Sequence, residues 1–194
     1  MSPQETSIAF NDSSYRYYYL CKYLPLSAGV DAPSRSLLKF KRCIRPDLDA
    51  WIESTLEVFH NIPLSSGTII IRALRHDETR VNTSPPSALD LLGQALAAGF
   101  QCQYLPSLLQ KSRPTLSNKG LTREQRETEL NEVYSIPPGI LPTNLSNPSF
   151  LLIDDILTTG ATIRAIIHTF HQTFPLSPLQ IFTLAKVDHP SPPE

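Results

Sequence analysis

Apolar residues recur along the chain with two different periods, which predicts strands that alternate with helices. The predicted strands are residues 67–71, 101–105, 150–153 and 179–184. The predicted helices run from Pro46 to about His60, from Pro86 to a stop at Gly99, over residues 124–134 and over residues 163–174. This alternation is typical of an α/β fold, with helices on both faces of a mainly parallel, twisted sheet.

The length of 194 residues suits a single domain spanning 1–194. Residues 1–14 are polar and 187–194 are proline-rich, so we expect both ends to be loosely ordered around a core at about 36–186. Between them, YRYYYLCKYL at 15–24 alternates like an edge strand and predicts a small N-terminal hood or edge element. We expect its tyrosines to pack on the sheet, and stacking on a base is the less favoured alternative. The tyrosines concerned are Tyr15, Tyr17, Tyr18 and Tyr19.

Charge and cysteine content exclude several classes of protein. A net charge of -1 gives no global attraction to nucleic acid. No apolar run reaches membrane-spanning length, and no signal peptide is visible. The three cysteines have no CxxC spacing, which argues against a zinc site or a disulfide framework and suits the cytoplasm. The sequence contains two basic stretches, 35–45 and 111–126. Each is either a solvated face or a functional surface, and the sequence does not decide between the two roles.

The sequence LLIDDILTTGAT at 151–162 carries the chemistry. Asp154 and Asp155 follow a short buried strand, at the edge where open parallel sheets place ligands. A small hydroxyl-rich turn then opens a helix, whose N–H groups and hydroxyls form an anion site. The residues of that turn are Thr158, Thr159, Gly160, Ala161 and Thr162. Carboxylates beside an anion cradle suit a phosphorylated sugar.

Other phosphate motifs do not account for this stretch. A Walker loop requires GxxxxGK[ST] and a Rossmann loop GxGxxG, and neither occurs in the chain. An acid pair also follows a strand in phospho-acceptor receiver domains, but there it comes early in the chain and without TTGAT. The alternative is that residues 151–162 have no binding function and form only a capped helix that follows two acidic residues.

The stretch resembles the phosphoribosyl-pyrophosphate (PRPP) signature of type I phosphoribosyltransferases. The resemblance implies that Asp154 and Asp155 hold the ribose 2- and 3-hydroxyls, while residues 158–162 clasp the 5-phosphate. Mg²⁺ is the expected cofactor, bound mainly by substrate oxygens and water, with weak help from Asp154 or Asp155.

A second loop, RALRHDET, follows the strand at 67–71 and opens at the same sheet edge. Arg72 and Arg75 could grip a pyrophosphate, because guanidinium groups match phosphate oxygens, although a surface salt bridge is the alternative. By resemblance, residues 72–76 take the place of the family's pyrophosphate loop. The PRPP-binding residues predicted here are Arg72, Ala73, Leu74 and Arg75.

The segment 107–126 is polar and basic and predicts a long mobile loop that closes over the site. It resembles the catalytic loop of the ComF-like (competence protein) branch of the family, in which basic residues precede a threonine, a leucine and an arginine at the head of a helix. The matching residues are Lys111, Arg113, Thr115, Leu121 and Arg126. The resemblance implies a catalytic set of Lys111, Arg113, Asp154 and Asp155.

The expected activity is therefore phosphoribosyl transfer from PRPP to a base or amine acceptor of unknown identity, with release of pyrophosphate, in nucleotide metabolism. The alternative is a non-catalytic PRPP-sensing or partner-binding protein of the ComF type, which is linked to DNA uptake. The expected partners are PRPP and the acceptor, without membrane or nucleic acid, and a homodimer is left open.

Overall fold

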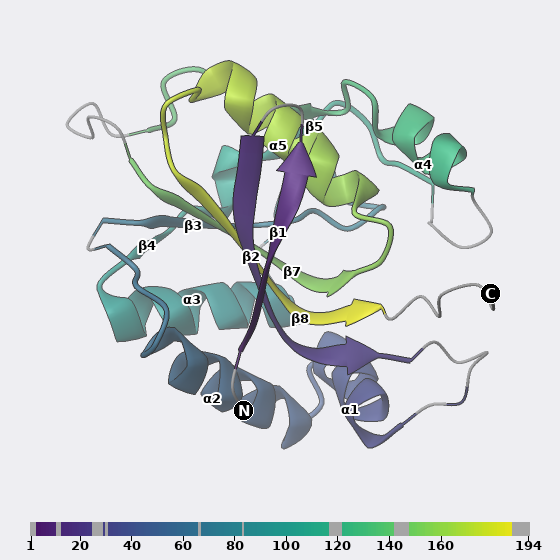
Figure 1. Cartoon of the computed structure of the whole chain (residues 1–194), viewed down its shortest axis with the longest axis vertical. Coiled ribbons are helices and arrows are strands. Elements are labelled where there is room, and N and C mark those ends of the chain that lie inside the picture. The colour runs from purple at the N-terminus through teal and green to yellow at the C-terminus, as the bar shows by residue number, and fades with distance from the viewer. Residues whose placement is uncertain are drawn as a thin grey trace.

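The computed structural model describes residues 3–10, 13–24, 29, 31–65, 67–82, 84–116, 122–141 and 148–187. Its centre is a six-stranded sheet in the order β1-β2-β8-β7-β3-β4 (Figure 1). All neighbours in this sheet are parallel except β1 and β2, which are antiparallel. The strands are β1 (Gln4–Phe10), β2 (Ser13–Tyr23), β3 (Ile69–Arg72), β4 (Gln103–Tyr104), β7 (Phe150–Leu157) and β8 (Leu179–Val187). The mainly parallel α/β fold is confirmed.

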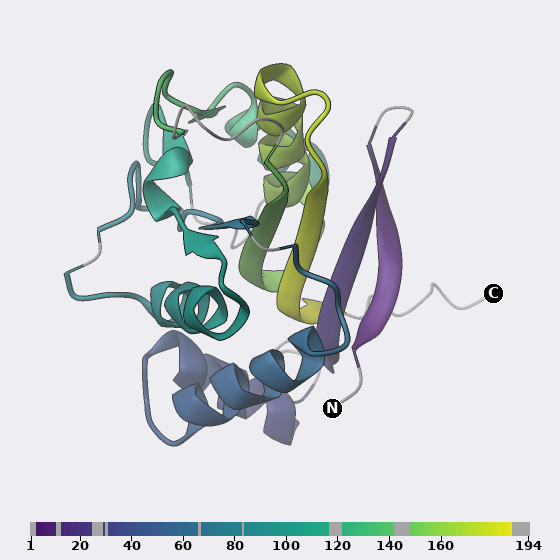
Figure 2. The ribbon, with the colours of Figure 1, turned by 90° about the vertical axis from the view of Figure 1, so that its left-hand side faces the viewer.

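Helices cover both faces of this sheet. The helices are α1 (Ala32–Lys41), α2 (Asp47–Phe59), α3 (Ala88–Phe100), α4 (Arg123–Leu130) and α5 (Ala161–Thr173). Figure 2 shows α1, α2 and α3 grouped on one side and α5 on the other. A 3₁₀ turn (Pro106–Leu108) leads to β5 (Gln110–Lys111), which pairs with β6 (Tyr134–Ser135) in a separate small sheet.

The central strands are buried on both faces, because successive side chains point to opposite sides. In β3, Ile69 and Ile71 belong to the apolar cluster that packs under α5. Ile70, between them, belongs to the second cluster, under α1, α2 and α3. Because its side chains alternate between the two faces, the short strand β3 contributes to both apolar clusters.

The predicted N-terminal edge element is confirmed, but two details of it differ from the expectation. Residues 4–10, expected to be loose, form the edge strand β1, whose mostly exposed side chains give no apolar pattern. The tyrosine-rich strand β2 consequently lies inside the sheet, between β1 and β8. Sheet packing is confirmed for Tyr17 and Tyr18, which are both buried, and the Tyr17 hydroxyl lies 2.7 Å from Thr183 Oγ1.

Smaller differences concern element ends. Helix α3 continues through Gly99 to Phe100, and its C-cap residue Gln101 adopts the left-handed conformation at φ 54° in place of the predicted glycine. The basic stretch 35–45, for which we predicted no element, contributes the second half of α1. Among the residues that the structure describes, no helix combines the length and hydrophobicity needed to span a bilayer.

Candidate functional site

Strand β7 carries the acid pair past the point where its neighbour β3 ends. We predicted a strand that stops at Ile153, but β7 continues to Leu157 because the long strand β8 pairs with it through Lys186. On the other side, pairing with β3 ends at Arg72 and Ile153. Asp154 and Asp155 therefore lie inside a strand, beside the open step that the end of β3 leaves in the sheet.

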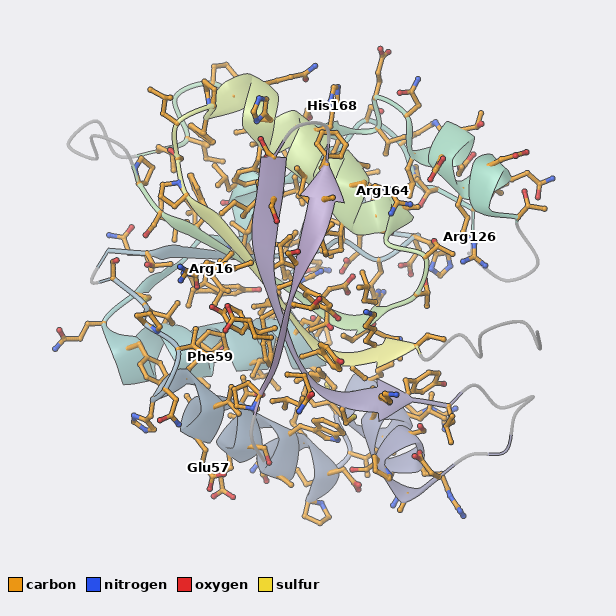
Figure 3. All side chains as sticks on the ribbon, in the orientation of Figure 1. Arg16, Glu57, Phe59, Arg126, Arg164 and His168 are labelled. Atoms are coloured by element: carbon orange, nitrogen blue, oxygen red, sulfur yellow. The ribbon has the colours of Figure 1, made fainter. Side chains whose placement is uncertain are left out.

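A cavity of about 580 Å³ opens at this step. It is lined by ten of the predicted site residues: Ala73, Leu74, Arg75, Asp154, Asp155, Thr158, Thr159, Gly160, Ala161 and Thr162. Further lining comes from Arg126 on α4, which is labelled in Figure 3, and from Lys41 at the end of α1. The structure thus brings together two loops that lie some eighty residues apart in the sequence.

The turn into α5 has the geometry of an anion site. Gly160 is the N-cap residue at φ 76°, a left-handed conformation in which a side chain is strained. A Cβ added there would lie 3.0 Å from Nη1 of Arg164. No described side chain caps the helix, so the N–H groups of its first turn remain available to a ligand in the cavity.

The acid pair is held by a lysine that the sequence did not single out. Lys41 Nζ lies 2.8 Å from Asp155 Oδ2. Burial disfavours the charged form of Lys41, but the carboxylates of Asp155 and Asp154 outweigh this effect and raise its pKa. Burial and the adjacent Asp155 carboxylate raise the pKa of Asp154 well above the usual range. Asp154 is thus close to protonation near neutral pH, and it can accept or donate a hydrogen bond to a hydroxyl.

Arg72 does not contact the cavity, which corrects its predicted role as a pyrophosphate ligand. Its side chain is 0% exposed. Its guanidinium donates to Asp90 Oδ1 at 2.6 Å and to both carboxylate oxygens of Glu78 at 2.8 and 2.9 Å. Because Arg72 continues the buried face of Ile70, it points toward α3, where Asp90 is located. Arg72 therefore holds the loop through Glu78 and Asp90 and does not line the cavity.

In the loop that follows β3, hydrogen bonds fix both the N–H and the carbonyl group of Arg75. Glu78 accepts the backbone N–H of Arg75 at 2.8 Å. Lys111 Nζ donates to the carbonyl oxygen of Arg75 at 2.6 Å, and the backbone N–H of Thr115 donates to the carbonyl of His76. The Arg75 side chain, 59% exposed, pairs with Asp77 on the surface. The loop therefore faces the cavity in a predefined shape.

The two cations predicted to be catalytic are both engaged elsewhere. Lys111 lies on β5, is 6% exposed and stands over the ring of Tyr134 at 5.5 Å. Burial lowers the pKa of Lys111 to about 8. Arg113 pairs with Glu129 at 2.7 Å. Neither side chain lines the cavity. Residues 117–121 of the predicted mobile loop, including Leu121, lie outside the described residues, so the lid stays a prediction.

A second cavity, of about 510 Å³, lies between α4, α5 and the end of β1. Arg164 and His168 line it and are labelled in Figure 3, and Arg164 Nη2 donates to Glu127 Oε1 at 2.9 Å. The signature turn contributes only Ala161 to its described lining. The acid pair and the turn at 158–162 line the first cavity instead.

The residues suit a metal that arrives with a substrate better than a resident metal centre. Within the described ranges, no group of three or more His, Cys, Asp or Glu side chains is arranged to hold a metal ion. Asp154 and Asp155 offer carboxylate oxygens, which Mg²⁺ prefers, but Lys41 already neutralises Asp155. A metal carried by phosphate oxygens would need no more than one carboxylate.

Comparison with known proteins gives no family. No protein-family model matches the chain, and no curated protein matches it in sequence. Among solved structures, it is similar to an adenine phosphoribosyltransferase, with 16% identity, a TM-score of 0.48 and coverage of 76% of this chain and 74% of that one.

Two further likenesses are of the same kind. Adenine phosphoribosyltransferase from Trypanosoma brucei, solved with AMP, pyrophosphate and ribose 5-phosphate, has 12% identity over 92% of this chain and 88% of that one, with a TM-score of 0.45. Hypoxanthine phosphoribosyltransferase from Staphylococcus aureus has 14% identity over 72% and 62%, with a TM-score of 0.43. At such values we base the function on the cavity and its motif alone.

Proposed function

We propose that the protein is a phosphoribosyltransferase that binds PRPP with Mg²⁺ and transfers its 5-phosphoribosyl group to a nitrogen acceptor. One observation carries the proposal. The acid pair, the uncapped turn at Gly160 and the loop at 73–76 line a single cavity at the end of the parallel strands. PRPP has three matching parts, namely vicinal ribose hydroxyls, a 5-phosphate and a pyrophosphate.

Each part of the cavity has a role in this proposal. The carboxylates of Asp154 and Asp155 hold the ribose hydroxyls, while residues 158–162 bind the 5-phosphate through N–H groups and hydroxyls. The backbone of 73–76 faces the pyrophosphate, and the Arg75 guanidinium binds it by exchanging its surface pair with Asp77 for phosphate oxygens. Because Lys111 and Glu78 fix the Arg75 peptide, these donors need little reorganisation when charge grows on the leaving group.

The reaction exchanges one bond at C1 of the ribose. The bond from C1 to the pyrophosphate oxygen breaks, and its electron pair leaves with pyrophosphate. The lone pair of the acceptor nitrogen then forms the new bond to C1, and that nitrogen gives up its proton to the departing pyrophosphate or to solvent. When bound together with PRPP, Mg²⁺ would supply positive charge beside the phosphate oxygens, and Asp154 or Asp155 would offer it at most one carboxylate. The chain itself binds and orients the sugar and the leaving group.

A second function is favoured by the engagement of the two loop cations. Lys111 bonds to the Arg75 carbonyl and Arg113 to Glu129, so the structure shows neither cation directed at a leaving group. A PRPP-sensing or partner-binding protein of the ComF type, related to DNA uptake, would retain the binding cavity without these catalytic contacts. The ComF-like resemblance itself stays a prediction from the segment at 107–126.

Pyrophosphate release separates the two functions. The protein is incubated with PRPP, Mg²⁺ and a panel of bases and amines, and PRPP affinity is measured alongside. For an enzyme, Lys111→Ala and Arg113→Ala should lower turnover far more than PRPP affinity. In the resting protein these side chains bond to Arg75 and Glu129, and they would reach the leaving group only as the transition state forms. PRPP binding without release of pyrophosphate in the presence of any of these acceptors would instead support the sensor, and absence of PRPP binding would refute both.

A further inference from the structure

One wall of the cavity remains unassigned once the sugar, the 5-phosphate and the pyrophosphate have been placed. It is formed by Tyr23 at the end of β2, Leu89 in the first turn of α3, Ile156 on β7 and Lys41 at the end of α1. If PRPP occupies the rest of the cavity, as the proposed function requires, this wall is left for the acceptor.

This wall differs in chemistry from the rest of the cavity. Tyr23, Leu89 and Ile156 all belong to the apolar cluster under α1, α2 and α3, or pack against it. The turn at 158–162 lies on the other side, where α5 begins. An aromatic ring beside aliphatic side chains is a surface on which a flat ring packs favourably.

The charged group among these four residues is the ammonium of Lys41. Lys41 Nζ bonds to Asp155 at 2.8 Å, and its side chain is 40% exposed. An ammonium carries three N–H donors, so one ion pair leaves donors for a second anionic partner. Lys41 and Tyr23 line the same cavity, which places the cation near the aromatic surface.

From this juxtaposition we infer that the acceptor is a flat ring that carries a carboxylate. The ring packs on Tyr23, Leu89 and Ile156, and the carboxylate accepts a hydrogen bond from Lys41. Lys41 is then a specificity-determining residue. It bridges the acceptor to Asp155, which holds the ribose, and so it brings the acceptor nitrogen toward C1.

Paired probes that differ in charge test this inference on the whole chain. Calorimetry first establishes saturation with ribose 5-phosphate and magnesium pyrophosphate, which fill the anion sites without reacting. Orotate against uracil, and nicotinate against nicotinamide, are then titrated into the loaded protein. Wild type should bind the carboxylated member of each pair about five- to twentyfold more tightly, as for a charged hydrogen bond at a partly exposed site.

Three variants separate the charge of Lys41 from effects on the fold. Lys41→Gln should bring the ratio of affinities close to one, whereas Lys41→Arg should retain the preference. Lys39→Gln is the matched control, because Lys39 lies on the same helix but pairs with Asp47 away from the cavity. Using a ratio removes any effect of Lys41 on the binding of the sugar phosphate itself.

The outcomes also distinguish this inference from the proposed function. Equal affinity for both members of each pair, binding of neither, or a preference that survives in Lys41→Gln would overturn the anionic acceptor. PRPP would still bind in each of those cases if the proposed function is right. A wild-type protein that binds neither ribose 5-phosphate nor pyrophosphate would instead remove the proposed function.

Discussion

Replacing Arg72 with methionine should destabilise the fold severely, although Arg72 contacts no ligand. The variant Arg72→Met keeps a long side chain but removes the guanidinium from between Asp90 and Glu78. Asp90 is fully buried and would keep only its bonds from Tyr104 and Ser87. A buried charge that loses its partner costs about 3–5 kcal/mol. For a chain of this length, that loss lowers Tm by about 6–20 °C.

The loss should depend on pH in a defined direction. Burial alone would raise the pKa of Asp90 and of Glu78, but the bonds from Arg72 prevail and lower both. A carboxyl group with a lowered pKa contributes stability that is fully present above its unfolded pKa of about 4 and is lost as pH falls through the folded value. The difference between wild type and Arg72→Met should therefore be largest at pH 7 and should shrink below about pH 4.

Arg75→Met is the matched control. Arg75 lies three residues after Arg72, and it pairs with Asp77 on the surface. A surface pair contributes about 0–1 kcal/mol, so this variant should unfold almost like wild type yet bind PRPP more weakly. Urea unfolding, followed by fluorescence of the buried Trp51, measures both variants. A loss below about 1 kcal/mol for Arg72→Met, or a difference that stays constant from pH 7 to pH 3, would refute the reasoning.

Two further predictions concern the turn and the buried lysine. Gly160→Val should weaken ribose 5-phosphate binding by at least about tenfold while the fold persists, since it strains the anion turn. Gly139→Val is its control, with a similar φ of 71° in open space, and equal binding by both variants would place the 5-phosphate elsewhere. Lys111 has a pKa of about 8 in the folded protein, below its unfolded value, so the folded state releases this proton first and stability rises between pH 8 and 10. Wild type should gain about 2–3 kcal/mol over Lys111→Met between pH 7.5 and 10 in urea unfolding, and parallel curves would show that Lys111 is not buried as described.

The site was predictable where its chemistry is local in the sequence. The strand, the acid pair and the hydroxyl turn follow one another within 151–162, and the structure keeps them together in one cavity. The edge strand β1 was not predictable from periodicity, because its side chains are largely exposed and its partner β2 defines it. Lys41 was missed for a similar reason, since only the tertiary packing of α1 brings it to Asp155.

The alternation of side chains in β3 contained information about Arg72 that its position at the strand end alone did not give. With period two, Arg72 falls on the same face as Ile70, which is covered by α3. A charged residue on a covered face requires a buried partner, and Asp90 is eighteen residues further along. Reading the strand's faces as well as its end would have separated Arg72 from Arg75.

The dependence of PRPP binding on the acid pair tests the account most directly. Titration calorimetry with PRPP and Mg²⁺ compares wild type with Asp154→Asn/Asp155→Asn, which keeps side-chain size and removes both charges. Asp49→Asn/Glu53→Gln is the control, because it removes the same number of carboxylates from α2, where neither residue lines the cavity. Hydrogen bonds to charged groups contribute about 1.5–3 kcal/mol each, so the site variant should lose at least about tenfold in affinity while the control binds like wild type. Equal affinity in all three proteins would contradict the assignment of this cavity to PRPP.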